Sequence, residues 1–90
     1  MRASGRTIRI IDQCIQDLFI KGYCLCIDHH ETIDACRFLF EGVLRRLNVE
    51  HRELLKGLVI DKNNMIIYFK GVVITKEINK MKDYLRSICH

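Results

Sequence analysis

The chain has 90 residues, enough for a single domain, 1–90, with a thin core, because folding at this size buries only about 60 to 65 per cent of the surface of the unfolded chain. A hydrophobic content of 49% excludes a disordered chain, and a net charge of +4 permits an acidic partner without requiring one. No apolar run could span a membrane and no secretory signal is recognisable, so we expect a cytoplasmic protein that binds no membrane.

The first predicted element is an amphipathic helix from Thr7 to Lys21. Its apolar residues recur at the spacing of one helical stripe, which predicts a buried face. Ser4 or Thr7 is a suitable N-cap, and Gly22 supplies the left-handed residue that ends many helices.

A strand and a second helix follow. The run Tyr23 to Ile27 is apolar on both faces, which predicts a central strand. Asp28 and Glu31 have the spacing of a capping box, and the apolar stripe after them predicts a helix that ends near Asn48.

The second half of the chain begins with a charged link, 49–57, in which we expect one helical turn. The runs 58–60 and 65–69 are separated by turn residues and predict a hairpin, and 72–74 predict a short further strand. Thr75 then caps a third amphipathic helix. The predicted fold is α/β (α+β), in the order α-β-α-β-β-(β)-α, with three helices on a three- to four-stranded mixed sheet that contains a parallel crossover.

The cysteines predict buried thiols. Their number is five and therefore odd, and no CxxC pair or structural zinc spacing is present. Cys24 and Cys26 alternate along the predicted strand, while Cys14 and Cys36 fall within helical periods. We expect them to behave as small hydrophobic residues in a reducing compartment.

The first candidate site is the turn Ser4, Gly5, Arg6 and Thr7 directly before the first helix. A turn that contains glycine and leads into a helix start is a generic anion site, so these residues predict phosphate binding. The alternative is that Ser4 only caps the helix and the arginines are solvated.

With the helix, strand and helix that follow, Ser4-Gly5-Arg6-Thr7 resembles the first part of P-loop ATPases of the helicase and phage terminase kind, and is also similar to small phage proteins that begin with a Gly-Arg-Thr turn. The resemblance covers about the first half of the chain and implies nucleotide binding. Arg6 stands where the P-loop lysine would, and the second loop glycine is absent, so the turn is a degenerate P-loop and no hydrolysis is expected.

The second candidate site is Asp28-His29-His30 at the end of the predicted strand. It resembles the signature motif of DHH phosphoesterases, which implies a divalent metal and phosphoester hydrolysis. Side chains at the carboxyl end of a strand converge where α/β proteins bind ligands. Alternatively, Asp28 caps the second helix and both histidines are ordinary polar residues.

A third feature is a basic cluster near the end of the second predicted helix: Arg45, Arg46, Arg52 and Lys56. It suits an acidic partner such as nucleic acid, although basic residues at this position also complement the helix dipole.

From these features we expect a small non-catalytic accessory protein, of phage or mobile-element type, that acts by binding a host or viral macromolecule. Inhibition of a host defence system would suit such a protein. The partner is a protein or a nucleic acid, and the surplus of apolar residues also permits a homodimer. No cofactor is required. The alternatives are a nucleotide or phosphate binder and a metal-dependent phosphoesterase fragment.

Overall fold

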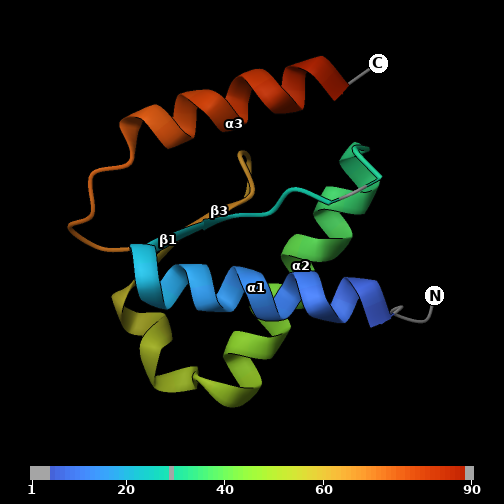
Figure 1. Ribbon diagram of the computed structural model, residues 1–90. Helices are drawn as coiled ribbons and strands as arrows, with labels where there is room; N and C mark the ends of the chain where they lie inside the picture. Colours follow the sequence, from blue (N-terminus) through green and yellow to red (C-terminus); the bar gives the residue numbers. More distant parts are fainter. Residues whose placement is uncertain (1–4, 29, 89–90) are drawn as a thin grey trace.

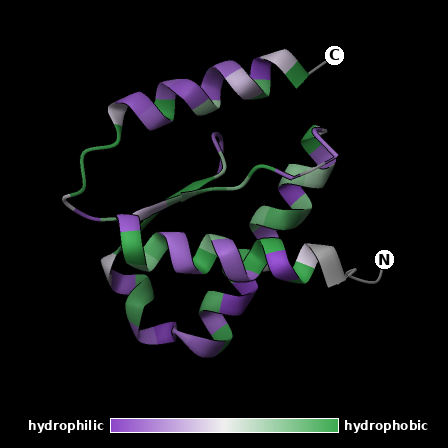
Figure 2. Ribbon diagram, viewed as in Figure 1, coloured by the Kyte–Doolittle hydropathy of each residue, from purple (hydrophilic) through white to green (hydrophobic). Residues whose placement is uncertain are grey.

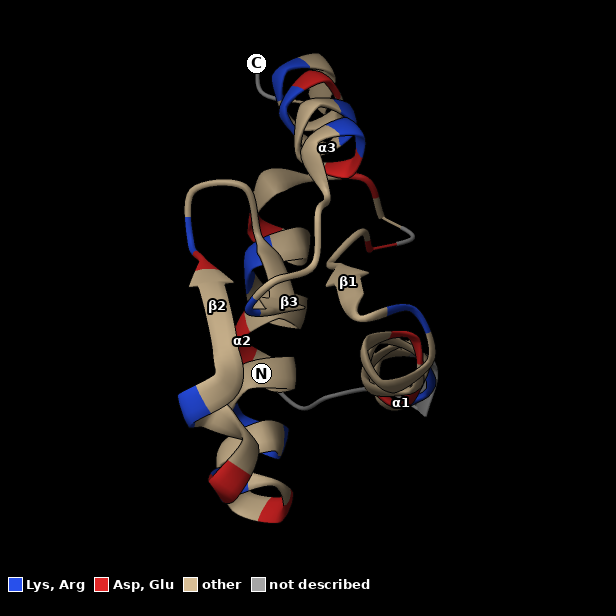
Figure 3. Cartoon of the chain, turned by 90° about the vertical axis from the view of Figure 1, so that its left-hand side faces the viewer, with Lys and Arg blue, Asp and Glu red and all other residues tan. Residues whose placement is uncertain are grey.

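The computed structural model describes residues 5–28 and 30–88 and confirms the α+β class and the predicted order of helices and strands. The elements are α1 (Gly5–Lys21), β1 (Tyr23–Leu25), α2 (Ile33–Glu50), the 3₁₀ helix η1 (Arg52–Gly57), β2 (Leu58–Asp61), β3 (Ile66–Phe69) and α3 (Thr75–Ile88). The helices surround a small sheet, with α1 on one side of the strands and α3 on the other in the view of Figure 1. Turned by 90°, the same chain shows α2 behind the strands (Figure 3).

The sheet has the order β1-β3-β2 and is antiparallel throughout, so the expectation of a mixed sheet was wrong. β1 and β2 do point the same way, as a crossover predicts, but β3 lies between them (Figure 3). The reason is the short loop after β2, which makes β3 the antiparallel neighbour of β2 and leaves the other edge of β3 for β1. Tyr68 of β3 thus faces both Tyr23 of β1 and Val59 of β2.

The optional fourth strand at 72–74 does not form in the described chain, so the sheet has three strands, within the predicted range. Gly71 adopts a φ of +93°, and the amide of Val72 donates to the carbonyl oxygen of Phe69 at 3.2 Å, so the chain turns away from the sheet directly after β3. The apolar residues that suggested a strand instead form the connection to α3, which is green in Figure 2. Of these, Ile74 is buried and Val73 is exposed.

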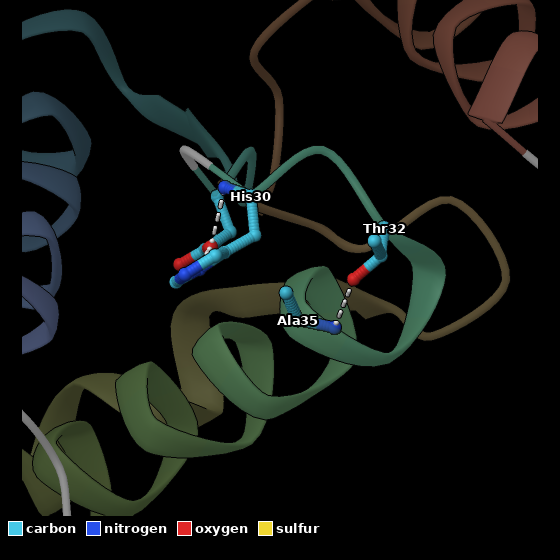
Figure 4. A network of polar contacts seen from close by, with 4 residues as sticks. His30, Thr32 and Ala35 are labelled. Atoms are coloured by element: carbon cyan, nitrogen blue, oxygen red, sulfur yellow. Dashed lines mark hydrogen bonds and ion pairs between the residues drawn. The ribbon is translucent and has the colours of Figure 1, made fainter.

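The N-terminus of α2 also differs from the prediction. Thr32, and not Asp28, caps this helix, because its hydroxyl accepts a hydrogen bond from the amide of Ala35 at 3.1 Å (Figure 4). Glu31 adopts a φ of +54° and separates the Asp28 turn from the helix. At the other end, α2 continues past Asn48 to Glu50, and η1 forms the predicted turn of helix in the link.

One core cluster joins all three helices to the sheet. Its fully buried members are Leu18, Cys24, Cys26, Cys36, Leu39, Val43, Leu47, Ile66, Ile67 and Met81. The four cysteines in the described part of the chain are free and buried, as predicted. Gly22, with a φ of +88°, ends α1 as predicted, and its amide donates to the carbonyl oxygen of Leu18 at 3.0 Å. No described helix is both long and apolar enough to cross a membrane.

Candidate functional site

A pocket of about 320 Å³ lies between α1 and α2, and we call it the α1–α2 groove. It is lined by Ile8, Ile11, Phe38, Glu41, Gly42, Arg45, Arg46, Val49 and Glu50. Its size lies at the lower end of the range for ligand pockets, roughly 300 to 1,000 Å³. The groove is therefore large enough for one or two side chains of a partner.

The groove exists because α2 carries a glycine where it meets α1. A Cβ atom on Gly42 would lie 2.8 Å from Cδ1 of Ile11, closer than real contacts, so the missing side chain lets the two helices approach. The larger residues on either side of this contact project outwards. Ile8 is 43% exposed, Phe38 38% and Val49 75%. Three large apolar side chains around one hollow form a patch of the kind that marks interaction sites.

The charges on the rim of the groove are of both signs. The guanidinium of Arg46 pairs with the carboxylate of Asp12 on α1 and lies 3.9 Å from that of Glu50. Arg46 is consequently held across the two helices, with 27% of its side chain exposed. Arg45 is exposed and has no ion-pair partner among the described residues, so it is the basic residue of the rim that is available to a partner.

Two of the four residues of the predicted basic cluster line the groove. Arg45 and Arg46 line the groove, whereas Arg52 and Lys56 lie on η1, are exposed and do not line it. Binding of an acidic partner by all four residues together stays a prediction.

The predicted phosphate-binding turn lies only partly in the described chain. Ser4 falls outside it, and so does any strand that would precede a P-loop. Gly5, Arg6 and Thr7 form the first turn of α1, and Thr7 is buried. Phosphate binding at this turn stays a prediction.

The Asp28 motif forms a local turn. Asp28 is 4% exposed, and its Oδ2 accepts from the backbone amide of His30 and lies 2.9 Å from Nδ1 of the same residue (Figure 4). His29 falls outside the described residues. Elsewhere in the described chain, no three His, Cys, Asp or Glu side chains are grouped as metal ligands, and His51 instead packs edge-on against Phe19. Metal binding by Asp28, His29 and His30 stays a prediction.

The groove was missed by sequence reasoning. Its signals are present in the chain, since Gly42 interrupts the apolar stripe of α2, and Phe38 and Val49 fall beside that stripe. A glycine within a helix costs about 1 kcal/mol relative to alanine, which is a reason to look for a close approach there. The partner helix of that approach is not readable from the sequence.

No known protein family, curated protein or solved structure matches the chain.

Proposed function

We propose that this chain is a small non-catalytic binding module that engages another protein through the α1–α2 groove. The observation that carries the proposal is the exposed apolar group Ile8, Phe38 and Val49 around a hollow whose rim offers Arg45, which pairs with no carboxylate of the described residues. Interfaces draw most of their energy from a few aromatic, apolar and arginine side chains at a central pocket. Phe38 is an aromatic residue and Arg45 an arginine, and both line the groove.

The charges of the groove favour a protein over a nucleic acid. Glu41 and Glu50 share the rim with Arg45, and carboxylates would repel a phosphate backbone. On α3, Asp and Glu are interspersed among Lys and Arg, so the helix carries charges of both signs (Figure 3). The groove therefore suits a protein that inserts an apolar side chain among Ile8, Phe38 and Val49 and places a carboxylate near Arg45.

The proposal is tested by placing a photo-crosslinking amino acid at Val49, which is exposed and lines the groove, in extracts of the source cells. The matched control carries the same group at Asn79, which is exposed on α3. We expect a discrete protein adduct from position 49 and none from position 79. The adduct should decrease at least about tenfold in Arg45→Glu, since a like charge at an interface costs several kcal/mol. Equal adducts from both positions, or an adduct to nucleic acid, would contradict the proposal.

A second measurement separates this function from phosphate binding at the start of α1. Ligands that bind the folded state raise the melting temperature by mass action. We expect no rise with ATP, GTP or inorganic phosphate. A rise that disappears in Arg6→Ala would instead establish the turn at Gly5 to Thr7 as a phosphate site.

A further inference from the structure

Three thiols meet between α1 and β1. Cys24 and Cys26 are two residues apart on an extended segment and therefore lie on the same face of it. Cys14 of α1 lies against that face, with its Sγ 3.9 Å from the carbonyl oxygen of Leu25, the residue between them. The three thiols are near enough to one another to perturb each other's ionisation. This set, Cys14, Cys24 and Cys26, is called the thiol cluster below.

The cluster distinguishes one thiol from the other two. Hydrogen bonds from Cys24 and Cys26 lower the pKa of Cys14 well below its ordinary value, although burial and the nearby Asp17 oppose this shift. The same contacts raise the pKa of Cys24 and of Cys26. Stabilisation of the Cys14 thiolate by its neighbours favours reaction at this residue, since the thiolate is the reactive form of a cysteine.

Cys14 is also the thiol of the cluster that solvent can approach. It lines a second pocket of about 280 Å³, on the side of α1 that faces β1, together with Arg9, Gln13 and Leu25. Cys24 and Cys26 do not line this pocket and are 1% and 0% exposed. A small oxidant that enters the pocket meets the Cys14 sulfur first.

We propose that the thiol cluster is a modification site at which a hydroperoxide oxidises Cys14, and that Cys24 or Cys26 then converts the product into a disulfide between α1 and β1. The Cys14 thiolate attacks the peroxide oxygen, forms an S–O bond and displaces an alkoxide or hydroxide, which takes up a proton. The neighbouring thiol then attacks the sulfenic sulfur, the S–O bond breaks and water leaves. In sum, two thiols are oxidised and one hydroperoxide is reduced to an alcohol and water, or to two waters.

The test treats the intact wild-type chain with hydrogen peroxide, blocks the remaining thiols and maps the products by mass spectrometry. Trypsin together with a protease that cleaves after Glu separates the relevant cysteines. The resulting peptides are 10–21 with Cys14, 22–31 with Cys24 and Cys26, 32–37 with Cys36, and 87–90 with Cys89. We expect a disulfide that joins peptide 10–21 to peptide 22–31. The mass of the chain should decrease by that of two hydrogen atoms.

Alkylation of the untreated chain gives an independent readout. Cys36 is a matched reference because it is buried in α2 and lies outside the cluster. We expect iodoacetamide to label Cys14 at least about tenfold faster than Cys36, because only a thiolate reacts appreciably. Cys14→Ala should retain a cooperative melting transition and lose the disulfide. Faster labelling of Cys36, a disulfide that excludes Cys14, or oxidation of Cys14 that stops at the sulfinic acid would overturn the proposal.

Discussion

Gly42 of α2 and Ile11 of α1 stand so close that a Cβ atom on Gly42 would come within 2.8 Å of Cδ1 of Ile11 and within 3.6 Å of its Cγ1. The contact joins the core to the groove, because Ile11 is 7% exposed and both residues also line the α1–α2 groove. The short distance involves the end of the Ile11 side chain and not the backbone of α1. It can therefore be relieved by removing one methyl group.

The Gly42–Ile11 contact predicts a coupled effect on stability. Gly42→Ala gains helix propensity of about 1 kcal/mol but displaces the end of Ile11. Ile11→Val removes the displaced methyl group at a cost of about 0.5 to 1.5 kcal/mol. We expect Gly42→Ala to be more favourable by about 1 kcal/mol in the Ile11→Val chain than in wild type, as measured by urea unfolding. If the effects of Gly42→Ala and Ile11→Val on the free energy of unfolding were additive, the two helices would adjust to the added methyl group without strain.

The adjacent arginines Arg45 and Arg46 predict opposite phenotypes. Arg46 connects α1 to α2 through Asp12, so Arg46→Ala should lower the free energy of unfolding by about 1 kcal/mol, and less at high salt. Arg45 has no such partner among the described residues, so Arg45→Ala should change stability by less than about 0.5 kcal/mol. Chemical denaturation at two salt concentrations tests this. Equal losses would mean that Arg45 also holds the helices together.

The Tyr84 hydroxyl is buried on α3 and has no hydrogen-bond partner among the described residues. Leaving a buried donor unpaired costs about 1 to 3 kcal/mol, so Tyr84→Phe should raise the free energy of unfolding by about 1 kcal/mol at neutral pH. Thermal and urea unfolding of the two chains measure this difference. A less stable Tyr84→Phe would reveal a partner for the hydroxyl.

The same tyrosine predicts a loss of stability in alkali. Burial, followed by the proximity of Cys36 and Glu31, raises the pKa of Tyr84 from 10.0 to about 12. Between these two values the folded state keeps the phenol proton that the unfolded chain releases. The contribution of Tyr84 to the free energy of unfolding is therefore fully present below pH 10 and is lost as the pH rises towards 12. The free energy of unfolding of Tyr84→Phe should fall less steeply over this pH interval than that of wild type. Parallel pH profiles for the two chains would indicate an ordinary phenol.

The buried carboxylate of Asp28 predicts a structural role that is independent of any metal. It accepts from the backbone amide of His30 and contacts the His30 ring, so Asp28→Ala removes the charged acceptor of both groups. We expect a loss of about 1 to 3 kcal/mol. His30→Ala, whose side chain is 67% exposed, should cost less because the backbone bond remains. Melting curves of both variants, with and without Zn²⁺, provide the measurement, and a metal-dependent rise in wild type would instead support the predicted metal site.

The local part of this structure was readable from the sequence. The stripe of α1, the stop at Gly22, the turn after Asp61 and the helical turn before Gly57 all depend on residues close to one another in the chain. The pairing of β1 with β3 depends on residues far apart in the chain, and an apolar strand fits a parallel or an antiparallel neighbour equally well. The groove and the thiol cluster are likewise hidden, since Ile11 meets Gly42, and Cys14 meets Cys24 and Cys26, only through tertiary packing.

The order β1-β3-β2 has a consequence for the growing chain on the ribosome. Strand β1 is made early, but the strand to which it pairs, β3, is translated after α2, η1 and β2. Until β3 emerges, no sheet exists. The backbone amides and carbonyls of β1, which carries Cys24, therefore have no neighbouring strand to bond to. Domains generally fold once their pairing elements are available. A nascent chain paused before Ile66 therefore offers chaperones an unpaired cysteine-rich strand, and translation of the β2–β3 hairpin is the step that completes the sheet.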